Sequence, residues 1–481
     1  MLSTTGCNPL SVDPVADPNN ADIAQVFNNP NTSQLNALAV GVESSYRLGH
    51  TNNAPYNQIT GVLGREILIL ASNEPRWYTE ILGTKRALGN NSFYSAGSYN
   101  AFARVIRAAK VFRQSASTAI PAVLDDKQKQ GVYGFSDTYE ALAKLHLINL
   151  MGENGIRVDV DDFLNPGKFT NGSTPALANI KTLLDQGASE LAKAGSSFNF
   201  PLSSGYAGFD TPADFLTFNR ALAARVALYQ KDYTGAQAAL NASFYDVSAT
   251  ASFKTGPKLV FNPAISGDQG NAYYQVPNTG PSTLVVVPDN FVTEADTIVL
   301  RRRLAPHTRD SVVTDARVAS KVSRRTNLRA LSGVTGNYDP LVYNSQTAPL
   351  DIIRNEELVL ISAEVKANSG DITGALSDIN TIRTRIAGLS NYRGPITLAA
   401  LNDEILKQRR YSLLYEGQRW IDLRRFGRLS SKTVVGTTSL EVAPAYTNGS
   451  KRQTIPYATG KYTIFDRLAK PFAEQAWDDS H

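Results

Sequence analysis

The sequence predicts a mainly α-helical fold in which tetratricopeptide-like helical hairpins form a scaffold, together with a loop-rich lobe that contains a few short strands. Three observations support this prediction. Apolar residues recur at helical spacing in several blocks, one hairpin pattern occurs twice, and a long stretch rich in Gly, Pro, Asn, Ser and Thr interrupts the helical blocks.

The helical scaffold is expected to cover about 33–151, 212–243 and 350–426. Within the first block, Tyr139, Leu142 and Leu145 share one face, as a period of about 3.6 residues requires. Breaks in the helices are expected near Pro121, Gly370 and Gly388.

One hairpin pattern occurs in two of these blocks. Residues 224–236 align without gaps to residues 363–375, and six of these thirteen positions are identical. In each copy an Asp is predicted to open a short turn, and a second helix to begin around Thr-Gly-Ala. The pattern resembles the tetratricopeptide hairpin without its full signature of about 34 residues. The alternative is an ordinary helical bundle with a chance similarity.

Two regions lack helical periodicity. Residues 246–349 mix short apolar runs such as 283–287 with many Gly, Pro and Asn residues, so we expect loops with a few short strands. Residues 427–481 are predicted to be a similar loop region. Long loops inside a compact fold often carry function, and we therefore expect the insert to form the ligand side of the molecule.

Composition excludes several classes of protein. The 481 residues carry 48 basic and 43 acidic side chains, and the densest basic cluster is only Arg301-Arg302-Arg303, so nucleic acid is not predicted as a partner. The single cysteine, Cys7, rules out an intramolecular disulfide and a multi-thiolate metal site. The four histidines are scattered, so neither a metal nor a cofactor is predicted. No apolar stretch approaches the length of a transmembrane helix.

The first residues look like the end of a lipoprotein signal. Small residues precede Cys7, although the charged and apolar regions of a signal peptide are missing and Thr4 replaces the usual leucine. The following residues are rich in Asn, Asp and Pro and are expected to form an extended tether. We therefore assign 1–22 to a lipoprotein-like N-terminus and tether and 23–481 to a single domain. The alternative is a free thiol in a flexible tail.

The most informative stretch is 405–425. Taken as one helix, it places Arg409 and Glu416 on the same apolar stripe as Trp420. Charged groups on such a face must be paired, because burying an isolated charge costs several kcal/mol. A structural polar network that fixes this helix to the hairpin repeat is therefore favoured over a catalytic role.

This stretch resembles the C-terminal signature of the SusD/RagB family. Gln408 and Ser412 stand where the family usually has glutamates. The resemblance covers the helical framework from about 33 to 430 and is strongest over 350–428. The residues that match the signature are Arg409, Leu413, Glu416, Gly417, Arg419, Trp420, Asp422, Leu423 and Arg425.

The resemblance implies a non-catalytic substrate-binding lipoprotein of the outer membrane, facing the cell exterior and anchored by a lipid on Cys7. Such a protein captures glycans or other nutrients and delivers them to a SusC-like TonB-dependent transporter.

A carbohydrate site needs aromatic faces and planar polar side chains. In the loop 72–78, Trp77 and Tyr78 are predicted to form a platform, with Asn73 and Arg76 as polar contacts. The alternative is that Trp77 caps the core. Secondary candidates in the insert are Tyr273, Tyr274 and Tyr338.

Two other functions are alternatives to ligand binding. A glycoside hydrolase needs two carboxylates that face each other across a cleft. The acidic clusters at 125–126 and 159–162 are expected to be solvated or turn-forming, and neither a Gly-rich phosphate loop nor a G-x-S-x-G motif is present. An enzyme is therefore not predicted. The second alternative is a tetratricopeptide-like scaffold for protein interactions.

Overall fold

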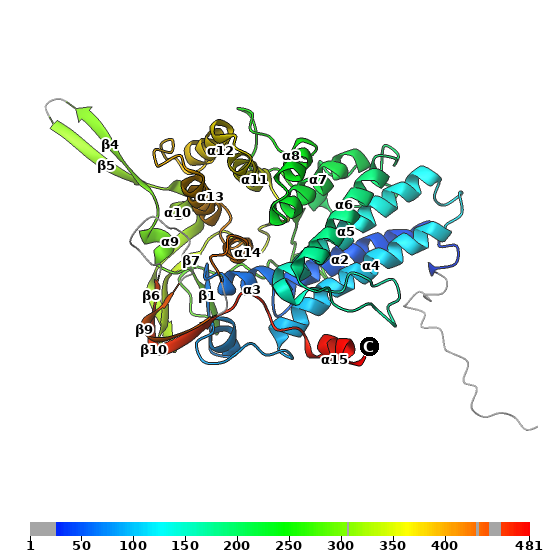
Figure 1. The fold of residues 1–481 in the computed structure, drawn as a ribbon, viewed down its shortest axis with the longest axis horizontal. Helices are drawn as coiled ribbons and strands as arrows, with labels where there is room; N and C mark the ends of the chain where they lie inside the picture. The colour runs from blue at the N-terminus through cyan, green and yellow to red at the C-terminus, as the bar shows by residue number, and fades with distance from the viewer. Residues whose placement is uncertain (1–25, 305–306, 430–431, 442–453) are drawn as a thin grey trace, which may run out of the picture.

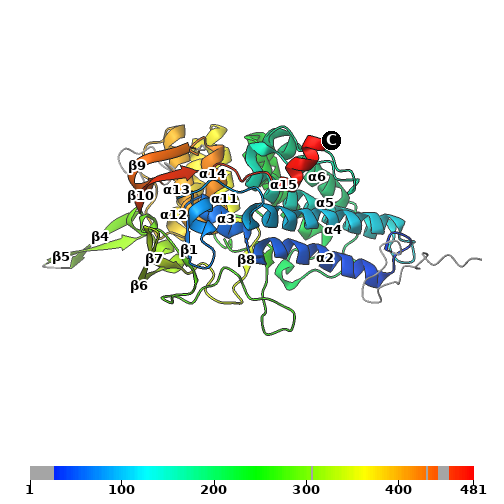
Figure 2. The ribbon, with the colours of Figure 1, turned by 90° about the horizontal axis from the view of Figure 1, so that it is seen from below.

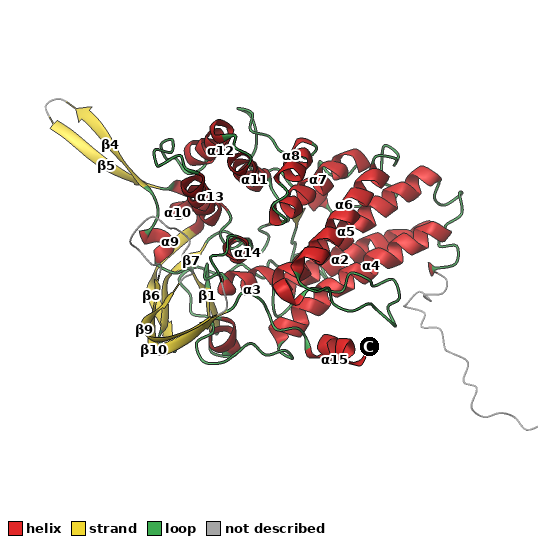
Figure 3. Cartoon of the chain, viewed as in Figure 1, coloured by secondary structure: helices red, strands yellow, loops and turns green. Residues whose placement is uncertain are grey.

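The protein is seen in a computed structural model. The structure describes residues 26–304, 307–429, 432–441 and 454–481. Cys7 and the expected tether lie outside the described residues. Long helices fill one end of the molecule, whereas short helices and strands fill the other (Figures 1 and 3).

The mainly α-helical fold class is confirmed. The longer helices are α2 (Thr32–Thr51), α4 (Ser98–Thr118), α5 (Asp126–Met151), α6 (Ser173–Leu191), α7 (Pro212–Tyr229), α8 (Tyr233–Asn241), α11 (Asn355–Asn368), α12 (Ile372–Arg385) and α13 (Leu398–Ser412). The shorter helices are α3 (Tyr56–Leu63), α9 (Asn290–Thr293), α10 (Ala316–Lys321), α14 (Arg419–Arg425) and α15 (Phe472–Ser480).

Helix α5 is the centre of the helical end. It packs against α4 on one side and against α6 and α7 on the other. Every residue from Gly134 to Met151 is buried, so the helix is enclosed on all faces rather than on one stripe. Its first turn is closed by a capping box in which Asp125 and Gln128 each accept a hydrogen bond from the other's backbone N–H, at 2.8 and 2.9 Å.

The predicted hairpin repeat is confirmed in α7–α8 and α11–α12. Asp232 accepts a hydrogen bond from the Gly235 N–H, and Asp371 accepts one from the Gly374 N–H, both at 2.9 Å. A Cβ atom at either glycine would lie about 2 Å from the carboxylate of the same Asp, which explains the Asp-x-x-Gly spacing. Helix α8 packs against α11, so the two hairpins stack. The small residues at the crossings are all buried: Ala224, Ala236, Ala363 and Ala375.

The insert between α8 and α11 contains short strands, as predicted. All strands pair antiparallel, and each belongs to a two-stranded sheet. The pairs are β1 (Leu68–Ala71) with β3 (Thr283–Val286), β2 (Lys258–Leu259) with β8 (Leu350–Asp351), β4 (Thr297–Leu304) with β5 (His307–Thr314), β6 (Val322–Leu331) with β7 (Val334–Pro340), and β9 (Lys432–Glu441) with β10 (Thr454–Ile464). The β4–β5 hairpin extends away from the body of the molecule (Figures 1 and 2).

Two segments differ from the prediction. Helix α6 was not expected, although its sequence places Pro175 in the first turn and buries Ile180 and Leu184 on one face. The C-terminal region 427–481 was expected to resemble the insert, with loops and a few short strands; its strands β9 and β10 are longer than expected, at 10 and 11 residues, and α15 was not expected. Its many Thr and Val residues favour strands, and this preference outweighs the Gly and Ser residues between them.

The stretch 405–425 is not one helix. Helix α13 ends at Ser412 and α14 begins at Arg419. Between them Tyr415 and Gly417 have positive φ angles of 65° and 78°. A Cβ atom on Gly417 would lie 2.8 Å from the ring of Tyr56, so glycine allows the turn to approach α3 closely. The helical stripe that was expected to join Arg409 and Glu416 is therefore wrong.

Two histidines lie in an aromatic core cluster formed by α2, α3, α4 and α5. His146 shares a hydrogen bond of 2.9 Å with the Tyr46 hydroxyl, and His50 one of 3.3 Å with the Tyr273 hydroxyl. Burial lowers the pKa of His50 to about 3 and holds the pKa of His146 well below its ordinary value. Both rings are therefore neutral in the folded protein at neutral pH.

These histidines predict a loss of stability in acid. The unfolded chain binds protons on histidine below about pH 6.5, whereas the folded chain does not, so the free energy of unfolding falls as the pH drops from about 6.5 towards 3. The slope reaches about 1.4 kcal/mol per pH unit for each histidine. Urea titrations of wild type and His50→Asn between pH 4 and 8 measure it. The variant should show a shallower slope than the wild type. Equal slopes for wild type and His50→Asn would contradict the assignment.

Candidate functional site

The predicted aromatic platform lies in the core. Trp77 is 4% exposed and Tyr78 9% exposed, and both belong to a π-helical turn that follows β1. The Trp77 ring packs edge-on against Phe93 with 5.4 Å between ring centroids. A sugar-stacking platform needs an accessible ring face, so the structure places Trp77 in the alternative role, in which it closes the core.

The predicted polar contacts of this loop are engaged with their neighbours. Arg76 forms a bidentate ion pair with Glu74, at 2.6 and 2.8 Å, and its guanidinium lies 4.8 Å from the centroid of the Phe93 ring. Asn73 is exposed and accepts a hydrogen bond of 3.0 Å from the Thr283 hydroxyl. Of the four residues predicted to bind a ligand in this loop, only Asn73 and part of Arg76 therefore face solvent.

The three tyrosines of the insert are not brought together with Trp77. Tyr273 is buried, where its hydroxyl accepts a hydrogen bond from the Asn57 N–H and its ring packs against Tyr343 and Tyr415. Tyr274 and Tyr338 are half-buried. Of the three, only these two have ring surface that a ligand can reach.

The signature residues form a buried ion-pair network. Arg409 donates to Asp422 at 2.6 Å, and Arg425 donates to the second oxygen of Asp422 at 2.9 Å. Arg425 also donates to Glu364 on α11 at 2.6 Å. Although burial raises it, the adjacent Arg409 and Arg425 hold the pKa of Asp422 below its ordinary value. The network therefore ties α13 and α14 to the second hairpin.

The remaining signature residues lie around the turn between α13 and α14. Glu416 pairs with Arg354, which precedes α11, and burial raises the pKa of Glu416 to about 7. Trp420 is fully buried and donates to the Phe465 carbonyl at 2.9 Å. Arg419 is buried as well, and Gly417 forms the turn itself.

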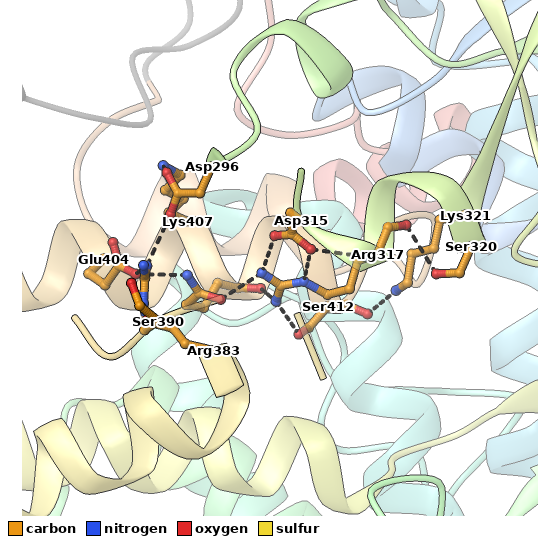
Figure 4. Close-up of polar contacts among 11 residues, drawn as sticks. Asp296, Asp315, Arg317, Ser320, Lys321, Arg383, Ser390, Glu404, Lys407 and Ser412 are labelled. Atoms are coloured by element: carbon orange, nitrogen blue, oxygen red, sulfur yellow. Dashed lines mark hydrogen bonds and ion pairs between the residues drawn. The ribbon is translucent and has the colours of Figure 1, made fainter. Parts of the chain in front are cut away.

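The two departures from the family signature have a local explanation (Figure 4). Arg317 on α10 forms an ion pair with Asp315 at 2.6 Å. The same guanidinium donates to the Gln408 side chain at 2.7 Å and to the Ser412 hydroxyl at 2.9 Å. Neutral acceptors are sufficient at 408 and 412, because Asp315 already supplies the negative charge.

Most of the acidic side chains considered for catalysis hold the local structure. Asp125 caps α5, and Asp161 pairs with Lys110 at 2.6 Å. Asp162 accepts hydrogen bonds from the backbone N–H groups of Leu164 and Asn165. These contacts are those of caps, turns and surface pairs.

An open pocket of about 390 Å³ lies between α4 and the 156–169 loop; we call it the α4 pocket. Helix α4 forms one wall and the loop the other, with Leu147 of α5 and Glu474 of α15 at the ends. The residues that line it are Tyr99, Asn100, Ala103, Arg104, Ile106, Arg107, Leu147, Arg157, Val160, Phe163, Pro166 and Glu474. Its volume and its mixture of apolar, aromatic and polar groups suit a small ligand.

The loop wall of the α4 pocket is held in place by Arg157. This guanidinium donates to the Glu474 side chain at 2.7 Å and to the Gly167 carbonyl at 2.5 Å, and it pairs with Asp478 at 2.8 Å. The Trp477 indole donates to the Pro166 carbonyl at 3.2 Å. The loop and α15 therefore support each other, and the pocket is preformed.

Two other cavities are less suited to a ligand. A cavity of about 340 Å³ beside α14 is lined by Arg424 and Arg425, but both guanidiniums already donate to backbone or carboxylate oxygens of the protein. A cavity of about 270 Å³ beside α2 contains Arg47, which pairs with Asp268 at 2.5 Å. The α4 pocket differs because two of the arginines that line it, Arg104 and Arg107, form no ion pair with the described residues.

Sequence reasoning missed the α4 pocket. Asn100, Arg104 and Arg107 follow one another at spacings of 4 and 3, which places them on one polar face of a helix. This spacing was a usable signal. The opposite wall could not be found in this way, because Phe163 lies in a loop without periodicity.

Neither a metal site nor a membrane-spanning helix is found in the described part of the chain. Within those residues, no group of three or more His, Cys, Asp or Glu side chains is arranged to hold a metal ion. None of the described helices combines the length and apolar character needed to cross a membrane.

Comparison with known proteins finds similarity to one protein family and to solved structures of one fold. Residues 331–475 match the model of the SusD family. A SusD-like protein from Bacteroides fragilis has 12% identity and a TM-score of 0.64, over 95% of this chain and 97% of that one. A SusD-like carbohydrate binding protein from Bacteroides vulgatus has 13% identity and a TM-score of 0.64, over 93% and 97%. A SusD superfamily protein from Bacteroides thetaiotaomicron has 16% identity and a TM-score of 0.63, over 92% and 98%. No curated protein sequence matches the chain.

The Asp422 network predicts a large stability effect. Replacing Asp422 by Ala leaves Arg409 and Arg425 buried without their shared carboxylate, which should lower the free energy of unfolding by about 3–5 kcal/mol. Urea denaturation measures this loss, with Asp479→Ala, at an exposed position, as the matched control. A loss below about 1 kcal/mol, the range of a surface pair, would show that the network does not hold these helices together.

Proposed function

We propose that this chain, which is a member of the SusD/RagB family, is a non-catalytic protein that binds glycans or related nutrients. The observation that carries the proposal is the match of residues 331–475 to the family, which includes the complete Asp422 network. A solved protein that matches this fold over nearly the full length of both chains is described as carbohydrate binding.

We assign binding to the α4 pocket. Phe163 is half-buried at its wall and Asn100 is exposed at its rim, so an aromatic ring and a planar amide lie on opposite sides of one opening. These are the groups that bind sugar rings and hydroxyls. The half-buried Tyr274 and Tyr338 of the insert form the alternative location.

The family also suggests where the protein acts. We propose that a lipid on Cys7 anchors the chain to the outer membrane with the folded body facing the exterior, and that a SusC-like TonB-dependent transporter receives the ligand. The position of Cys7 supports this proposal, because 24 residues separate it from Thr32, where α2 begins. A chain of that length gives the folded body room to stand away from the membrane surface.

Calorimetric titration of the full chain against oligosaccharides tests the binding proposal. At least one oligosaccharide class should bind, and Phe163→Ala should weaken it about fivefold or more, because packing on an aromatic ring contributes roughly 1 kcal/mol or more. Leu164→Ala is the matched control, because Leu164 is the next residue and is 89% exposed. Thermal melts of both variants verify folding.

The outcomes separate the location from the function. If binding survives Phe163→Ala and is lost in Tyr274→Ala or Tyr338→Ala, the protein binds glycans through the insert. If no member of a broad panel of neutral and acidic oligosaccharides binds, the glycan-binding function is refuted.

Anchoring is tested separately by fractionation. Produced with a lipoprotein leader in a Gram-negative host, the chain should sediment with the outer membrane, and Cys7→Ser should release it into the soluble fraction. A single acyl group binds membranes weakly, whereas the multiple chains of a lipoprotein hold firmly, so the shift should be nearly complete. Membrane association that persists in Cys7→Ser would contradict the lipid anchor.

A further inference from the structure

The rim of the α4 pocket carries two arginines without a carboxylate partner. Arg104 and Arg107 are exposed on α4, and neither lies within 4 Å of a carboxylate oxygen of the described residues. Within the described residues, the Arg107 guanidinium makes a cation–π contact with the Phe163 ring, 4.3 Å from the ring centroid. By contrast, the neighbouring basic residues Lys110 and Arg113 on the same helix form ion pairs.

The two guanidiniums belong to one face. A spacing of three residues places their Cβ atoms about 5–6 Å apart on a helix. Like charges at this spacing repel each other, and an anion that lies between them removes the repulsion. The pair therefore has the geometry to hold one anionic group bidentately or two anionic groups on successive units of a ligand.

The one carboxylate that lines the α4 pocket is already paired. Glu474 is the only carboxylate in its lining, and it pairs with Arg157 at 2.7 Å. Arg157 also pairs with Asp478, which pairs in turn with Lys470 at 2.8 Å, so two cations balance two carboxylates without a ligand. Asp161 of the loop is paired with Lys110. Asp159 and Asp162 of the loop lie outside the lining. Among the described residues that line the pocket, the charge left without an ion pair is that of Arg104 and Arg107, which is positive.

We propose that the α4 pocket selects oligosaccharides that carry anionic groups, either uronate carboxylates or sulfate esters, through Arg104 and Arg107. This inference rests on the glycan-binding function proposed above and adds the class of glycan. The Arg107 guanidinium lies over one face of the Phe163 ring, and the remaining surface of that ring contacts the sugar. The two guanidiniums on the facing helix bind its negative group. A neutral oligosaccharide leaves both guanidiniums without a charged partner and gains only the ring contact.

Calorimetry on the full chain tests this selection with four probes: a tetragalacturonate, a sulfated oligosaccharide of similar length, maltotetraose as the neutral glycan, and inorganic sulfate. An anionic oligosaccharide should bind at least tenfold more tightly than maltotetraose, with an affinity that falls as salt is added. Arg104→Gln should weaken it about tenfold or more and leave the affinity for maltotetraose unchanged. Arg107→Gln also removes the contact with the Phe163 ring, so it should weaken the anionic oligosaccharide about tenfold or more and maltotetraose by a smaller factor. Arg393→Gln, at an exposed position between α12 and α13, is the control and should change nothing.

The two acidic probes identify the source of the anionic group. Tighter binding of tetragalacturonate points to carboxylates and tighter binding of the sulfated probe to sulfate esters, and either result supports the inference. Inorganic sulfate bound as tightly as the oligosaccharides would overturn it, because the pocket would then be an anion site alone. Neutral and anionic oligosaccharides of equal affinity, with no effect of either substitution, would overturn the inference and leave the glycan-binding function intact. No binding of any glycan would refute both.

Discussion

Asp422 lies between the guanidiniums of Arg409 and Arg425, away from water. Removing these charges from water costs several kcal/mol for each ion, so the arrangement is stable only while all three side chains remain in place. Because Arg425 also reaches Glu364, the constraint links three helices that are separated in sequence. This cluster positions the second hairpin and the turn between α13 and α14 relative to each other.

The same requirement separates structural arginines from those available to a ligand. Arg225, Arg317 and Arg354 are buried, and each is paired with a carboxylate and with further oxygen acceptors. Arg104 and Arg107 are exposed at a preformed pocket and have no such partner among the residues that the structure describes. A charged group that the fold does not use costs little at the surface and remains free to bind an anion. We therefore propose ligand binding at these two arginines, which the ion pairs of the described residues leave out.

Local patterns were sufficient for most of the helical framework. The Asp-x-x-Gly turns at 232 and 371 were predicted because each cap is formed within four residues. The turn at Gly417 was not predicted, because its cause is the ring of Tyr56, which is distant in sequence. The burial of Trp77 was not predicted for the same reason. Nothing in the loop around Trp77 indicates that Phe93 and the core will cover the indole.

The sequence by itself determined the fold class, the stacked hairpins, and the need for the charges of 405–425 to be paired, because periodicity, capping and desolvation are local properties. Only the tertiary structure decided which partner each charge takes and where a pocket remains open. Arg157 and Glu474, which hold the wall of the α4 pocket, are more than 300 residues apart, and their contact is formed only when the whole chain has folded. Exposure is likewise decided by what packs nearby, and no local pattern contains that information.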